Sequence, residues 1–167
     1  GADSTTPKAP WAGGGKEGVA EEGNKVVDLN SAYRHKVDAK GRMSLPASFR
    51  KVLSTDLVVT RNPKDECLYV FEPDAFNAWV AGVFEDKFEK FDRANDLHVR
   101  LRRKLKSRAA DVSIDAAGRI MISAEQREAV GIDKEVVVVG NTGYFEIWDA
   151  KRYDAVDDET DLGLLFD

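Results

Sequence analysis

Two arginines in this 167-residue chain each end the same short pattern: an aspartate, two further residues, a glycine and then the arginine. The first copy is Asp38–Arg42 and the second is Asp115–Arg119, 77 residues later. An aspartate followed by a glycine at this spacing is typical of a tight turn in which the glycine takes a positive φ. An arginine held by such a turn can bind a phosphate, or hold the edge of a guanine with two hydrogen bonds. A pair of such arginines suits a polyanion better than a small-molecule reaction.

The side chains around these turns divide into cations that could contact nucleic acid and residues that shape the turns. The expected DNA-binding residues are Lys40, Arg42 and Arg119, with Arg34 and Lys36 extending the same basic surface, and the turn-shaping residues are Asp38, Gly41, Asp115 and Gly118. An aspartate at the first position of a turn accepts backbone N–H groups, so neither aspartate is expected to be catalytic. The alternative role for each arginine is an ion pair with the aspartate of its own turn. The counterpart of Lys40 is Ala117, so we expect the first turn to dominate binding.

Residues that could support catalysis or bind a metal are not arranged for either purpose. His35, Cys67 and His98 lie about 30 residues apart and have no paired-ligand spacing. The chain has no glycine-rich phosphate loop and no nucleophile beside a base. We therefore expect no enzyme activity, no cofactor, no bound metal and no small-molecule substrate.

The net charge of −5 is distributed unevenly along the chain. Residues 31–153 carry 22 basic and 19 acidic residues, whereas residues 154–167 carry six acids and no base. The segment from His98 to Arg108 holds six cations and no acid, and it either contacts DNA or forms the solvated face of a helix. No apolar run reaches the roughly 20 residues of a membrane helix. A single cysteine is compatible with a reducing cytoplasm.

The two turns belong to repeated units with the same order of elements. In each unit we expect a strand, the turn, a second strand, a short helix and a final hairpin of two strands. The first unit covers about 33–76 and the second about 110–153. In the second unit, Ser123 and Gln126 have the spacing of a capping box at the start of the short helix.

Three other segments complete the chain. Apolar stripes predict a helical hairpin between the units, with helices over roughly 74–90 and 94–109. The leader at 1–28 is rich in glycine and charge, and we expect it to be disordered. The acidic tail covers 154–167.

In their order along the chain, these features resemble the MraZ family, which belongs to the larger group of AbrB-like DNA-binding folds. Besides the two turns, the resemblance includes Tyr33-x-His35, Leu45-Pro46-x-x-Phe49-Arg50 and the closing segment Phe145–Asp149. It runs from about Leu29 to Tyr153, so the domain is expected over 29–153, with the leader and tail outside it. The family usually has glycine where this chain has Ser31, and phenylalanine where it has Leu29.

The resemblance implies an α+β fold in which the two repeats form a double-split β-barrel, with the helical hairpin between them. It also implies a sequence-specific DNA-binding transcriptional regulator, located in the cytoplasm and at the nucleoid. Ring-like homo-oligomers would act on double-stranded promoter repeats upstream of the division and cell-wall gene cluster. The alternative is a ring-forming scaffold or antidote-like protein that binds a partner through its tail, where acids alternate with Leu162, Leu164, Leu165 and Phe166.

Overall fold

The computed structural model describes residues 26–166, which form an α+β fold. The first unit contains β1 (Ala32–Lys36), β2 (Arg42–Ser44), α1 (Ala47–Arg50), β3 (Asp56–Arg61) and β4 (Leu68–Phe71). Two helices follow, α2 (Pro73–Phe88) and α3 (Asp96–Ser107). The second unit contains β5 (Ala110–Ser113), β6 (Arg119–Met121), α4 (Ala124–Ala129), β7 (Glu135–Gly140) and β8 (Phe145–Asp149). The chain ends with α5 (Ala150–Glu159) and a 3₁₀ turn, η3 (Leu162–Leu165). Each unit therefore has the predicted order of elements.

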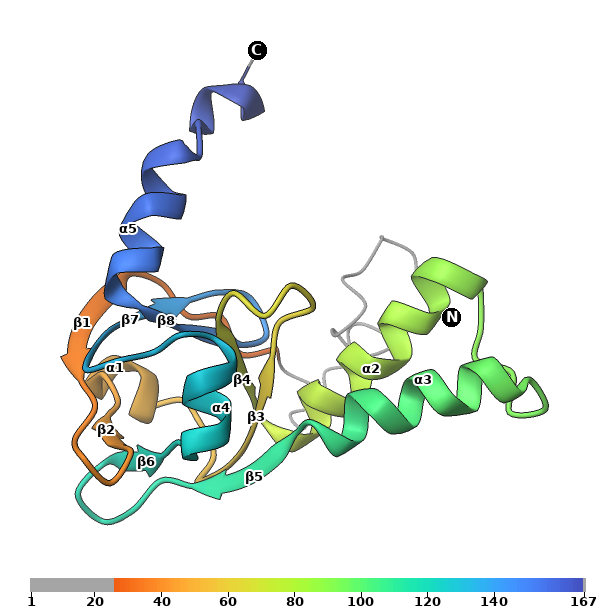
Figure 1. Ribbon diagram of the computed structural model, residues 1–167, viewed down its shortest axis with the longest axis horizontal. Helices are drawn as coiled ribbons and strands as arrows, with labels where there is room; N and C mark the ends of the chain where they lie inside the picture. Colours follow the sequence, from red (N-terminus) through yellow and green to blue (C-terminus); the bar gives the residue numbers. More distant parts are fainter. Residues whose placement is uncertain (1–25, 167) are drawn as a thin grey trace.

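The two units exchange strands to build one antiparallel sheet. Its order is β1-β7-β8-β4-β3-β5, so the first strand of each unit pairs with the third strand of the other. The units also meet where β4 pairs with β8, and in a separate two-stranded ribbon formed by β2 and β6. Figure 1 shows this ribbon below the sheet, at the opposite end of the molecule from α2 and α3. The prediction that the units pair is confirmed. Hydrogen bonding between the described strands gives a sheet and a ribbon, without closing them into one barrel.

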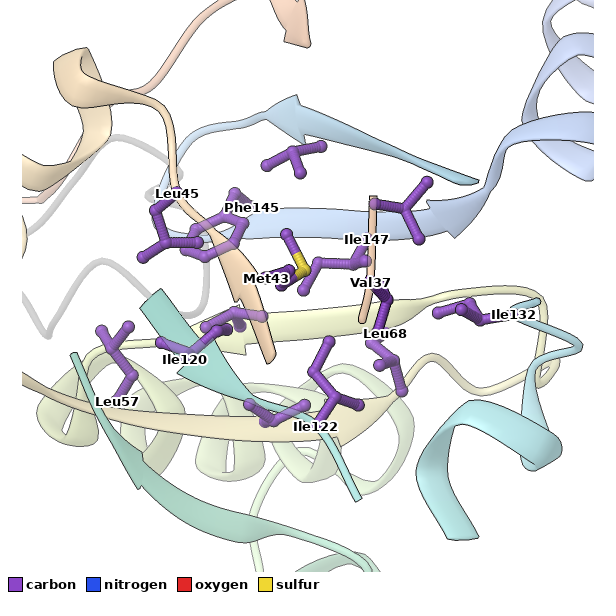
Figure 2. Close-up of a cluster of buried hydrophobic side chains, with 14 of the residues drawn as sticks. Val37, Met43, Leu45, Leu57, Leu68, Ile120, Ile122, Ile132, Phe145 and Ile147 are labelled. Atoms are coloured by element: carbon purple, nitrogen blue, oxygen red, sulfur yellow. The ribbon is translucent and has the colours of Figure 1, made fainter. Parts of the chain in front are cut away.

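The main core lies between the ribbon and the six-stranded sheet. Met43 and Ile120 face each other at the centre of the ribbon, and each side chain is only 1% exposed. Figure 2 shows them pointing toward apolar side chains of the sheet, including Leu68 and Ile147. Burying a side chain of this size contributes about 1.5–3 kcal/mol, so this core fixes the ribbon against the sheet.

A second core lies under the two helices, where the sequence predicted a helical hairpin. Phe76, Trp79 and Phe84 of α2 are buried, and they form a cluster with Val58 of β3 and Phe71 of β4. The apolar residues of α2 recur every three or four positions, which places them on one side of the helix. This cluster fixes the hairpin on the β3–β4 end of the sheet.

The described fold includes residues before the boundary predicted for the end of the leader. The Gly143 amide donates to the Val27 carbonyl at 2.6 Å, and Asp28 forms a β-bridge with Thr142. The Thr142 hydroxyl also donates to the Asp28 carboxylate at 3.0 Å. Residues 27 and 28 are therefore part of the fold, because they pair with the β7–β8 turn. Residues 1–25 of the predicted leader lie outside the described part.

The acidic tail begins within the last helix, which includes its residues 154–159. The Asp149 carboxylate caps α5 by accepting from the amides of Lys151 at 3.2 Å and Arg152 at 3.4 Å. The helix packs against β7 and β8 at its start and then projects away from the sheet (Figure 1). It carries the apolar residues of η3 out into solvent.

Candidate nucleic-acid interface

The exposed face of the β2–β6 ribbon places the two arginines together. Arg42 lies opposite Met121 and Arg119 lies opposite Ser44, so the pairing is related by a two-fold axis through the ribbon. Successive side chains of a strand point to opposite faces. Because the central residues of both strands are buried, both arginines share the outer face. Diagonal neighbours of this kind lie about 7–8 Å apart, which puts the guanidinium groups on one small surface.

The aspartates shape the two turns in the same way. One carboxylate oxygen of Asp38 accepts from the amides of Lys40 and Arg42, each at 2.9 Å. Asp115 accepts in the same way from the amides of Ala117 and Arg119, also at 2.9 Å. Hydrogen bonds from the backbone amides, first of all that of the arginine, lower the pKa of each aspartate below its ordinary value. Both aspartates therefore lie at the first position of a turn and accept the backbone amides of that turn, as expected from the sequence.

Each arginine also pairs with the aspartate of its own turn. The Nε of Arg42 lies 2.8 Å from the Asp38 carboxylate, and the Nε of Arg119 lies 3.3 Å from that of Asp115. These pairs use only Nε, and within residues 26–166 the terminal Nη atoms of both arginines have no recorded partner. The arginine side chains are 34% and 35% exposed. The ion pair therefore orients each guanidinium while its two outer nitrogens remain available to a ligand.

The glycines let each turn approach the other unit closely. Gly41 has φ 91° and Gly118 has φ 81°, a region that residues with a Cβ rarely adopt. The Gly41 carbonyl accepts from the Ile122 amide at 2.8 Å, and the Gly118 carbonyl accepts from the Leu45 amide at 3.0 Å. Each turn is therefore held by the residue that directly follows the ribbon strand of the other unit.

Two further arginines lie against the turns, and sequence reasoning assigned them no role. Arg127 at the end of α4 lies against Gly41, and its Nε donates to the Ile122 carbonyl at 3.1 Å. Arg50 at the end of α1 lies against Gly118. A signal was present in the sequence, because Arg50 and Arg127 are separated by the same 77 residues as the turns.

The other predicted cations lie beside the ribbon and differ in how they are engaged. Lys40 is exposed at the tip of the first turn, and Lys36 is exposed on β1. Arg34 on β1 donates to the Asp154 carboxylate of α5 through both Nη atoms, at 2.6 and 3.4 Å. This hydrogen-bonded ion pair raises the pKa of Arg34. Arg34 is thus paired with the tail, whereas Lys36 and Lys40 have no ion-pair partner within residues 26–166.

The basic segment at 98–108 lies in the hairpin and not beside the ribbon (Figure 1). Two of its cations form ion pairs: Arg100 with Asp96 at 2.9 Å, and Arg108 with Asp65 at 2.6 Å. His98 is buried, and its Nδ1 accepts from the Asp92 amide at 3.0 Å.

The histidines and the cysteine do not form a common site. Cys67 is fully buried, and burial raises the pKa of its thiol. His35 is half-buried on β1, where desolvation lowers its pKa. Across residues 26–166, no three His, Cys, Asp or Glu side chains gather in a way that could hold a metal ion. None of the helices in this same range is both long enough and apolar enough to cross a membrane.

The fold and this surface define an α+β protein of two intertwined repeats, whose paired turns present arginines on one exposed ribbon. The chain belongs to the MraZ family. The family described as "MraZ protein, putative antitoxin-like" matches residues 29–98 and 105–164. The match reaches residue 164, so it includes most of the acidic tail that we had placed outside the resemblance.

Curated relatives agree with the family assignment. The chain is 39% identical over 126 residues to proteins from Burkholderia cenocepacia, Burkholderia lata and Burkholderia thailandensis. Each of these matches covers 71% of this chain and 80% of the relative. All three relatives are named transcriptional regulator MraZ.

Proposed function

We propose that this protein is a sequence-specific, double-stranded DNA-binding transcriptional regulator, and that the β2–β6 ribbon with its two turns is the DNA contact. The observation that carries this proposal is the pair of arginines on the outer face of the ribbon, each fixed through Nε with its Nη atoms available. The family and the names of the relatives support the same function. The protein acts in the cytoplasm, at the nucleoid.

The geometry suits readout in the major groove, which is wide enough to admit a two-stranded β-ribbon. Arg42 and Arg119 keep the two outer nitrogens that hold guanine O6 and N7, or a phosphate. Their aspartates fix them before DNA arrives, so less side-chain entropy is lost on binding. Lys40 contributes an exposed charge next to Arg42, suited to the backbone. The first turn therefore contributes more to DNA binding than the second turn does.

Assembly into homo-oligomeric rings supplies the affinity that one ribbon lacks. Each chain offers few cations to DNA, and linked weak contacts raise the apparent affinity through effective concentration. Rings of this kind act on promoter repeats upstream of the division and cell-wall gene cluster. The sheet and the ribbon together form a double-split β-barrel. The exchange of strands between the units and the contacts of β2 with β1 and of β6 with β5 support this assignment.

The direct test is a mobility shift with the chain's own upstream DNA. Arg42→Ala should weaken specific binding by about 1–3 kcal/mol, and should lower the log–log salt slope by about 1 for each phosphate that the arginine neutralises. Arg119→Ala should weaken binding less. The matched control is Arg100→Ala, which removes an arginine that pairs with an aspartate four residues away through the same Nε atom, but on α3.

Light scattering should find the Arg42→Ala assembly unchanged. Wild-type affinity in Arg42→Ala would exclude the ribbon as the DNA contact. A large loss of affinity in Arg100→Ala would assign that contact to α3 instead.

The second candidate is a protein-binding scaffold or antidote, favoured by the exposed apolar end of the tail. Leu162, Leu164, Leu165 and Phe166 are 68%, 75%, 75% and 83% exposed. Replacing Leu164, Leu165 and Phe166 with serine in the full chain separates the two functions. DNA affinity that survives this replacement on a single-repeat duplex supports the regulator. The scaffold is supported if no specific DNA binding is found in either protein.

A further inference from the structure

A groove between α2 and α3 has an apolar floor and a cationic rim. Its volume is about 440 Å³, and Val80, Ala81 and Phe84 of α2 line the floor. Lys90, Arg102 and Lys106 stand along the rim. Glu85 is the one acid among the lining residues, so the rim is cationic overall.

Aromatic rings beneath the rim hold two of these cations in place. The guanidinium of Arg102 lies 3.7 Å from the centre of the Phe91 ring, and the ammonium of Lys106 lies 5.0 Å from that of Phe76. Lys106 also donates to the Asn77 side-chain oxygen at 3.0 Å. Neither cation has an acidic partner in the described chain, so both keep a full charge for a ligand. The groove therefore fits a segment that combines apolar side chains with carboxylates.

The last part of this same chain has that composition. Four apolar side chains, Leu162, Leu164, Leu165 and Phe166, are exposed after a run of acids, Asp157, Asp158, Glu159 and Asp161. A segment of this kind can place leucine and phenylalanine on the apolar floor while its carboxylates meet the rim. Exposed apolar side chains gathered at one end of a helix mark a contact site.

We propose that the groove binds residues 157–166 of a second copy of this chain. The occupant is a second copy because α5 is anchored beside β1 by the Arg34–Asp154 ion pair and points away from the hairpin (Figure 1). A tail-to-groove contact joins different surfaces of two copies, and repetition of such a contact gives a ring where the rotation closes. This inference rests on the homo-oligomeric part of the proposed function and names the contact that makes the oligomer.

Charge reversal in the full chain tests the pairing of tail and groove. The groove variant is Arg102→Glu with Lys106→Glu, and the tail variant is Asp158→Lys with Asp161→Lys. Each places like charges together, so each should weaken self-association by at least about tenfold in sedimentation or light scattering. The chain with all four substitutions restores opposite charges and should assemble again. The matched control is Arg103→Glu with Lys104→Glu, the same charge change on exposed α3 residues that do not line the groove.

The outcomes separate this inference from the DNA-binding proposal. Circular dichroism establishes that each variant is folded, and a mobility shift on a single-repeat duplex reports the ribbon independently of assembly. Weakened assembly in both reversed variants, with rescue in the fourfold variant, supports the contact. Unchanged assembly in the groove variant overturns the contact but leaves the DNA function intact. A wild-type chain that stays monomeric overturns both the contact and the ring.

Discussion

The two turn glycines are equivalent in sequence, yet alanine should cost much more at Gly41 than at Gly118. Both have a positive φ, which costs a residue with a Cβ about 1–2 kcal/mol, partly offset by the smaller entropy of unfolded alanine. At Gly118 the added Cβ would overlap the end of the exposed Arg50 side chain, which can rotate away. At Gly41 it would overlap the Ile122 carbonyl oxygen, which belongs to the backbone of the partner unit.

Moving that carbonyl disturbs two hydrogen bonds. The Ile122 amide donates to Gly41, and the Ile122 carbonyl accepts from Arg127. Each is worth about 0.5–1.5 kcal/mol. Gly41→Ala should therefore lower the free energy of unfolding by about 2–4 kcal/mol, and Gly118→Ala by about 1 kcal/mol.

Urea unfolding followed by tryptophan fluorescence, at one protein concentration, measures this difference. Gly131→Ala is the control for the backbone cost alone. Gly131 has φ 73°, and an added Cβ would lie at an ordinary contact distance of 3.4 Å from Arg152. Gly131→Ala should lower the free energy of unfolding by about as much as Gly118→Ala does. Equal losses of stability at Gly41 and Gly118, or a larger loss at Gly118, would refute the idea that a rigid partner carbonyl controls the first turn.

Three other substitutions or labels follow from single residues. Ser31 has φ 78° at a position where the family usually has glycine, so Ser31→Gly should raise the free energy of unfolding by about 0.5–1 kcal/mol. Urea unfolding measures this change, and an unchanged or lower free energy of unfolding would contradict backbone strain at Ser31. Burial raises the pKa of Glu146 in the folded protein above its unfolded value of about 4.3. Its contribution to stability is therefore fully present when the pH is below this unfolded pKa, and it is lost as the pH rises through the pKa of the folded protein. Glu146→Gln keeps an acceptor for the Trp148 indole and should be the more stable protein at pH 7 but not at pH 4, so a stability difference that does not depend on pH would exclude this cause. The buried Cys67 thiol should react with an alkylating reagent only as fast as the chain opens, and rapid labelling of the native protein would show that the site is accessible.

The turns and the arginines could be predicted because their signals are local. A glycine that needs a positive φ, and an aspartate that accepts the amides of its own turn, act within five residues. The repeat then required the two copies to occupy related positions. The helical hairpin was also predictable, since the apolar spacing of Phe76, Trp79 and Phe84 defines one face of a helix.

The partners of individual residues could not be predicted, because they depend on contacts distant in sequence. The alternating pattern of β1 marks a strand without showing that it pairs with β7 of the other unit. Ser123 caps α4 as expected, accepting from the Gln126 amide at 3.1 Å. The Gln126 side chain, however, is buried and donates to the Val59 carbonyl at 2.9 Å, so it does not complete the predicted capping box. The pairing of Arg34 with Asp154 likewise required the position of α5.

The exchange of strands between the units also limits how this protein can be made on the ribosome. The partner of β1 emerges roughly 100 residues after it, which at about 5–20 residues per second is a delay of about 5–20 s. Until Glu135–Gly140 is synthesised, the nascent first unit has a strand with no mate and an open apolar surface. A ribosome that stalls before this point therefore releases an aggregation-prone fragment, and not a smaller domain that folds independently.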